Sequence, residues 1–172
     1  MCSSDLEDEE RVYTYRQLLQ AVCRFANGLS RLGVRKGDRV CIYMPVVPEQ
    51  VIAMLACARI GAIHSVVFGG FGVNALNQRI RGIDAKVVIT ADVTYRRGRA
   101  IPLKTIVEEP VVNAPSVERI VVLRRDLDKP VELHPEMEVD YHDLMDGESR
   151  ECPAEPMDAE DPLFILYTSG TT

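Results

Sequence analysis

Short apolar segments alternate with helical segments along most of this chain, and this alternation constrains the fold more than any other feature. Four segments have the length and composition of buried strands: 40–44, 62–67, 85–90 and 119–123. Four others have the apolar spacing or composition of helices: 14–32, 49–60, 73–80 and 102–109. Strands that alternate with helices predict an α/β fold with a mostly parallel sheet, helices on both faces and right-handed crossovers.

Particular residues should set the ends of these helices. Thr14 and Gln17 have the spacing of a capping box, which starts a helix by satisfying free backbone N–H groups. Gly33 should end that helix. The helix at 102–109 should stop at Pro110, because proline has no N–H to continue the hydrogen bonding.

Both ends of the chain and residues 126–162 depart from the alternation. Residues 126–162 carry 14 acidic and 2 basic side chains and five of the ten prolines. We interpret them as an acidic, proline-rich surface excursion with one short strand near Val139–Tyr141. Residues 1–10 contain five acidic side chains and are interpreted as a disordered leader. A last buried strand is expected at Leu163–Tyr167.

Composition excludes several classes of protein. With 172 residues, 47% of them hydrophobic, the chain is expected to form one globular domain or a large piece of one. Its apolar runs are shorter than the roughly 18 residues of a membrane span, and no secretory signal is visible. Five cysteines without a CxxC pair exclude a disulfide framework or Cys-rich zinc site and favour a reducing, cytoplasmic location.

Charge is distributed unevenly along the chain. Residues 11–125 carry 18 basic and 7 acidic side chains. Such a basic region attracts polyanions such as nucleotides, although the acidic segments could equally do no more than balance it. Aromatic residues make up only 6% of the chain, too few for the stacking array of a nucleic-acid-binding surface.

Three loops are candidates for binding phosphate. Thr168–Thr172 carries four hydroxyls and a glycine after an apolar segment, although an ordinary polar turn has the same composition. Phe68–Gly72 holds three glycines, which allow close approach of a ligand or simply a tight turn. Arg96–Arg99 carries three guanidinium groups, which suit phosphate oxygens but also occur in solvated loops. His64 is interpreted as a satisfied core histidine.

Several segments together resemble the acyl-adenylate-forming enzymes and, within them, the AMP-forming acetyl-CoA synthetases (acetate–CoA ligases). The last segment is similar to the start of the phosphate loop YTSG[ST]TGxPKG of the superfamily, and the middle ones are typical of the short-chain acyl-CoA synthetase branch. The resemblance is carried by Tyr13–Leu18, Val34–Met44, Pro48–Gly70, Arg96–Lys104 and Pro162–Thr172.

The resemblance implies a two-step reaction. Acetate attacks the α-phosphate of ATP, which gives acetyl-adenylate and pyrophosphate, and the thiol of CoA then displaces AMP; the cofactors implied are ATP, Mg²⁺ and coenzyme A. Gly70, Arg96 and Arg99 would contact CoA, while Arg97 would point elsewhere. The ATP phosphates would be held by Thr168, Ser169, Gly170, Thr171 and Thr172.

The same resemblance implies that residues 11–172 are part of the large N-terminal domain of such an enzyme, without the C-terminal domain. The phosphate loop is cut before its second glycine and its lysine, so we expect no catalytic residue, no metal ligand and no turnover in this chain alone. Gly72 stands where a serine commonly caps the next helix.

Other functions remain open at this point. The chain could be a catalytically inactive module that binds a nucleotide or CoA, or part of another short-chain synthetase such as a propionyl-CoA synthetase. A nicotinamide-dependent oxidoreductase is disfavoured because GxGxxG is absent. The expected partners are small molecules, with neither nucleic acid nor membrane among them, and the oligomeric state stays undetermined.

Overall fold

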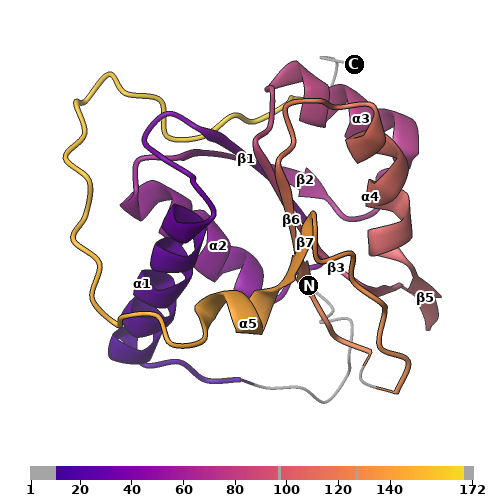
Figure 1. The fold of residues 1–172 in the computed structure, drawn as a ribbon, viewed down its shortest axis with the longest axis horizontal. Helices are drawn as coiled ribbons and strands as arrows, with labels where there is room; N and C mark the ends of the chain where they lie inside the picture. Colours follow the sequence, from indigo (N-terminus) through magenta and orange to yellow (C-terminus); the bar gives the residue numbers. More distant parts are fainter. Residues whose placement is uncertain (1–10, 97, 127, 169–172) are drawn as a thin grey trace.

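A computed structural model describes residues 11–96, 98–126 and 128–168 (Figure 1). The helices of this part are α1 (Tyr15–Arg31), α2 (Pro48–Arg59), α3 (Val73–Gly82), α4 (Leu103–Val112) and α5 (Tyr141–Met145). Its strands are β1 (Arg39–Met44), β2 (Ile63–Phe68), β3 (Val87–Ala91), β4 (Thr94–Arg96), β5 (Arg99–Ile101), β6 (Arg119–Leu123) and β7 (Glu138–Asp140).

The main sheet is parallel throughout, with the strand order β2-β1-β3-β6-β7. Helices α1, α2 and α5 lie on one face and α3 and α4 on the other (Figure 1). Strands β4 and β5 form a separate antiparallel hairpin. This architecture confirms the α/β prediction, including helices on both faces of a mostly parallel sheet.

The central strands are apolar because both of their faces are covered. Side chains from Val40 to Met44 are at most 1% exposed, and those from Val87 to Ala91 are fully buried. Strands covered on both faces have near-continuous apolar runs, which is why sequence alone located them. Burial also raises the pKa of the Cys41 thiol to about 12, so Cys41 is an uncharged member of the core.

Helix α1 begins as the capping box predicts. The backbone N–H of Gln17 donates to Oγ1 of Thr14 at 3.3 Å, and the Thr14 N–H donates to Oε1 of Gln17 at 2.8 Å. Gly33 follows the helix with φ +91°, a conformation that favours glycine. The ring of Phe25 stacks on Tyr141 of α5 at a centroid distance of 4.3 Å, which joins two distant parts of the chain.

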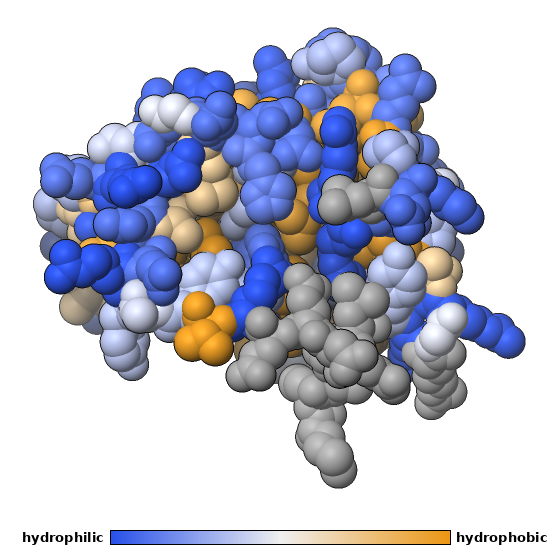
Figure 2. Space-filling view, turned by 90° about the horizontal axis from the view of Figure 1, so that it is seen from below, coloured by the Kyte–Doolittle hydropathy of each residue, from blue (hydrophilic) through white to orange (hydrophobic). Residues whose placement is uncertain are grey.

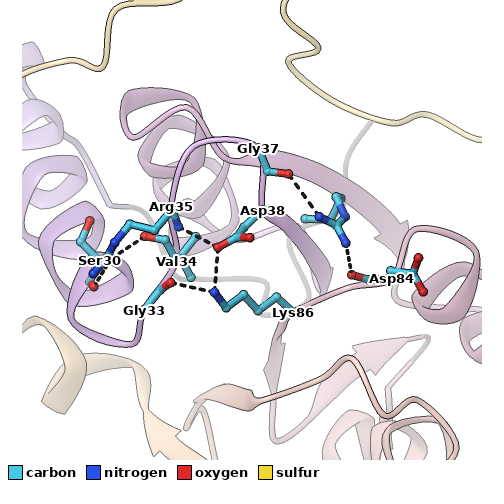
Figure 3. Close-up of polar contacts among 9 residues, drawn as sticks. Ser30, Gly33, Val34, Arg35, Gly37, Asp38, Asp84 and Lys86 are labelled. Carbon is cyan, nitrogen blue, oxygen red and sulfur yellow. Dashed lines mark hydrogen bonds and ion pairs between the residues drawn. The ribbon is translucent and has the colours of Figure 1, made fainter.

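A polar network holds the turn between α1 and β1 against the start of β3 (Figure 3). The Asp38 carboxylate accepts from the backbone N–H of Arg35 at 2.8 Å and from Nζ of Lys86 at 2.9 Å. Lys86 also donates to the carbonyl of Gly33 at 2.8 Å, and Arg39 donates to the carbonyl of Asp84 at 3.0 Å. These contacts set the amino-terminal edge of the sheet.

The predicted stop at Pro110 is wrong, because α4 continues to Val112. Pro110 lies in the last turn, so the helix loses a single hydrogen bond there, and its ring is buried. The side-chain amide of Asn113 donates to the carbonyl of Glu109 at 3.0 Å and so completes the helix end.

The predicted buried strand at Leu163–Tyr167 is also wrong. It makes one parallel bridge, His64 to Phe164, and Ile165 donates to the carbonyl of His64 at 2.9 Å. Leu163, Phe164 and Leu166 are 51%, 54% and 67% exposed. This segment has β2 on one side only, so within the described residues neither a ladder nor burial develops.

Residues 126–162 contain the expected short strand, β7, paired in parallel with β6 over Glu138–Asp140. The side chain of Asp140 then caps α5 by accepting from the backbone N–H groups of His142 and Asp143. Further on, the chain runs across α1 and α2, where Arg31 pairs with Glu148 at 2.6 Å.

Hydrophilic side chains cover most of the face seen in Figure 2, with apolar atoms visible between them. None of the helices in the described ranges is long and apolar enough to cross a membrane. Four cysteines in these ranges are free and buried: Cys23, Cys41, Cys57 and Cys152. Their burial confirms that they fill the core.

Candidate functional site

A cavity of about 480 Å³ lies where β1 and β2 end, against the β4–β5 hairpin. The carboxyl ends of parallel strands are the usual place for ligands in open α/β sheets. The fold therefore brings two of the predicted site residues, which are distant in sequence, to one cavity. Its lining includes Met44, Phe68, Gly70, Tyr95, Arg96 and Leu166.

The backbone of Gly70 lies tightly against two side chains that line this cavity. A Cβ atom at Gly70 would lie 2.4 Å from a ring carbon of Phe68 and 3.1 Å from Nη1 of Arg96. Any larger residue would displace one of these two side chains. Phe68 is 58% exposed, so its ring presents an aromatic surface to a ligand.

The hydroxyl of Tyr43, in β1, binds the backbone of the glycine-rich loop. It donates to the carbonyl of Phe71 at 2.6 Å, and the carbonyl of Gly69 lies 3.5 Å away. Burial raises the pKa of Tyr43 to about 12, so the hydroxyl keeps its proton and remains a donor. Phe71 in turn packs edge-on against Phe68 at 5.9 Å.

Arg96 and Arg99 stand directly opposite each other in the β4–β5 hairpin, which turns at Gly98 with φ +72°. Opposite residues of an antiparallel pair project from the same face, and like charges there repel. Both side chains are exposed, and no carboxylate of the described ranges pairs with either. Two guanidinium groups held together in this way suit a phosphate group. Arg97 lies outside the described residues.

Asp92 fixes the base of this hairpin and was missed in the sequence. Its buried carboxylate accepts from the backbone N–H groups of Val93 at 2.6 Å and of Arg125 and Asp126 at 3.0 Å each. A charged residue directly after a buried strand is a signal that could have identified it. Tyr43 and Phe68 were missed because their apolar surroundings make them resemble core residues.

The predicted phosphate loop is only partly visible. Thr168 is described, whereas Ser169, Gly170, Thr171 and Thr172 lie outside the described residues. Leu166 lines the same cavity as Gly70, so the chain approaches the carboxyl ends of the strands just before this loop. The roles of Thr168–Thr172 stay a prediction.

His64 is a core histidine, but not a satisfied one. Its side chain is 6% exposed, and within the described ranges its Nδ1 atom has no hydrogen-bond partner. Burial lowers its pKa, so the ring is neutral near pH 7. Among the described residues, no three His, Cys, Asp or Glu side chains are grouped so as to hold a metal ion.

Comparison with known proteins assigns this chain to a family. The sequence pattern of the AMP-binding enzymes matches residues 2–172.

The chain belongs to the AMP-binding enzyme family.

Acetyl-coenzyme A synthetases are among the proteins similar to this chain. That of Methanothrix thermoacetophila is 55% identical over 165 residues, which are 95% of this chain and 25% of the relative. Acetyl-coenzyme A synthetase 2 of Pseudomonas aeruginosa is 52% identical over 168 residues, or 98% of this chain and 26% of the relative. The chain thus spans about a quarter of the length of these relatives.

A solved synthetase structure has the same fold. Acetoacetyl-CoA synthetase from Streptomyces lividans superimposes with a TM-score of 0.86 at 28% sequence identity. The match covers 95% of this chain and 25% of that structure. The fold therefore corresponds to one part of a larger synthetase.

Proposed function

We propose that this chain is part of the N-terminal domain of an AMP-forming acetyl-CoA synthetase. In that enzyme, acetate and ATP form acetyl-adenylate and pyrophosphate, and CoA then displaces AMP. Within the whole, the chain supplies part of the CoA site and the start of the ATP phosphate loop. The names of the similar relatives support acetate as substrate, and propionate is the alternative among short-chain acids.

The observation that carries the proposal is the corner formed by Gly70, Arg96 and Arg99. The glycine allows the ring of Phe68 and the guanidinium of Arg96 to pack against its backbone, and the flat adenine base of CoA would lie on the exposed part of that ring. The paired guanidinium groups at the hairpin would bind the phosphates of the same molecule. A nucleotide phosphate would thereby neutralise two facing like charges.

The ATP phosphates would be held at the end of Leu163–Tyr167, by backbone N–H groups and hydroxyls of Thr168–Thr172. Mg²⁺ would neutralise charge on the phosphates in the complete enzyme. The described residues offer no group of ligands for it, so we assign it none in this part of the chain. The free, buried cysteines fit a cytoplasmic location.

A first experiment is to sequence the gene beyond the codon for Thr172. Continuation in frame with Gly, a variable residue, Pro, Lys and Gly would complete the phosphate loop. The complete product should then form acetyl-CoA from acetate, ATP and CoA. A stop codon directly after Thr172 would leave the chain as a binding module and refute the ligase proposal.

A second experiment separates the CoA site from general basicity. Arg96→Ala and Arg99→Ala should each weaken CoA binding in calorimetry by about 1.5–3 kcal/mol, as expected for a hydrogen bond to a charged group. Arg119→Ala is the matched control, since Arg119 is an exposed arginine at the start of β6, whereas the cavity lies at the carboxyl ends of β1 and β2. Equal losses in all three variants would show non-specific attraction only.

A further inference from the structure

Arg79 of α3 is a buried cation held between two aromatic rings. Its side chain is 7% exposed, with the guanidinium carbon 4.4 Å from the ring centroid of Phe71 and 5.1 Å from that of Tyr167. Nη1 donates to the carbonyl of Ala75 at 2.8 Å. No carboxylate in the described ranges forms an ion pair with it. Burying a charge without an ion-pair partner costs free energy, so the contacts with the two rings must offset part of that cost.

One ring lies in the glycine-rich loop, and the other lies directly before the predicted phosphate loop. Phe71 lies in the glycine-rich loop beside the cavity, and Tyr167 directly precedes Thr168, where the phosphate loop begins. Gly82 makes room for Tyr167 on α3, because a Cβ atom there would lie 2.7 Å from the Tyr167 hydroxyl oxygen. One side chain on α3 therefore contacts the glycine-rich loop and the residue that leads into the predicted phosphate loop.

We propose that Arg79 is a positioning residue that holds Phe71 of the glycine-rich loop and Tyr167, the residue before the predicted ATP phosphate loop, in one relative arrangement. A planar guanidinium has two faces and two edges with which to meet two rings, whereas the compact ammonium of lysine favours one ring at a time. Through this shared contact, the position of Phe71 supports the position of Tyr167, and the reverse. The inference rests on the proposed function, since it concerns the binding of ATP and CoA.

The test uses the complete protein that carries residues 1–172. Arg79→Lys keeps the positive charge and should raise the KM for ATP in acetate-dependent ATP–pyrophosphate exchange, a step that needs no CoA. The same variant should raise the KM for CoA in the complete reaction. We expect increases of about 3- to 10-fold in each, from the loss of one ring contact. Arg81→Lys, an exposed arginine on the same helix, is the control and should leave both values unchanged.

Single-ring variants test the same coupling without changing Arg79. Phe71→Leu should raise the KM for CoA and, through Arg79, also the KM for ATP, and Tyr167→Leu should likewise raise both. A purely structural role would instead lower the melting temperature and the kcat while leaving both KM values unchanged. That result in Arg79→Lys and in both ring variants would overturn the inference. Absence of ATP–pyrophosphate exchange in the unaltered complete protein would overturn the proposed function, and this inference with it.

Discussion

Replacing Gly70 by alanine tests the CoA corner most directly. The new Cβ atom would lie 2.4 Å and 2.9 Å from two ring carbons of Phe68. Non-bonded carbons prefer a separation of about 3.5–4.0 Å, so the ring must move by roughly 1 Å or more. Phe68 is 58% exposed and can rotate into solvent, which takes its aromatic face away from the cavity.

The expected magnitudes separate folding from binding. The φ of Gly70 lies outside the positive range, so alanine adds no backbone strain and restricts the unfolded chain. The free energy of unfolding should therefore change by less than about 1 kcal/mol. Stacking of a base on an aromatic ring contributes about 1–3 kcal/mol, so the Kd for CoA should rise roughly 5- to 160-fold.

The assay is calorimetric titration of CoA into each variant, together with urea unfolding. Gly72→Ala is the matched control, because a Cβ atom there meets nothing within 4 Å. It should leave CoA affinity unchanged. Unchanged affinity in Gly70→Ala would refute the argument that the close approach of Gly70 and Phe68 forms the CoA site. A large loss of stability would refute the argument that Phe68 is free to move.

Two further predictions concern buried charge. Because burial lowers the pKa of His64, the unfolded state takes up its proton first as the pH falls below about 6.5, and the free energy of unfolding should fall by up to about 1.4 kcal/mol per pH unit. Urea unfolding at pH 7.5 and 5.5 should show less of this loss in His64→Gln and the full loss in the control His134→Gln. In the second, Glu138→Gln should cost about 3 kcal/mol, because it removes a buried partner 3.2 Å from Lys104. Glu108→Gln, which changes the half-exposed partner of the same lysine, should cost less than about 1 kcal/mol in the same assay, and equal costs would contradict the role of burial.

The central strands could be predicted because their signal is local. Val40–Met44 and Val87–Ala91 are covered on both faces, so every residue in them is selected for burial. The α1 cap was also predictable, since Thr14 and Gln17 interact within one turn. The short strand expected near Val139–Tyr141 is present as β7.

Two predictions failed where the outcome depends on which groups supply hydrogen-bond partners. Whether Pro110 ends a helix depends on what satisfies the last carbonyl groups, and Asn113 supplies a donor. Whether Leu163–Tyr167 becomes a strand depends on partners on both sides, and β2 provides only one bridge. The same apolar sequence would be found whether this segment pairs with one neighbouring strand or with two.

The sequence by itself determined the order of most helices and strands and marked Phe68–Gly72 and Arg96–Arg99 as candidate phosphate-binding loops, because periodicity and residue chemistry are local properties. The resemblance to a family then singled out Gly70, Arg96 and Arg99 within these loops. Only the tertiary structure decided that Gly70 and Arg96 line one cavity, that Arg99 faces Arg96 across a hairpin, and that Arg79 lies between two rings. Parallel pairing of β1, β2 and β3 places their carboxyl ends side by side, and side chains far apart in the chain meet there.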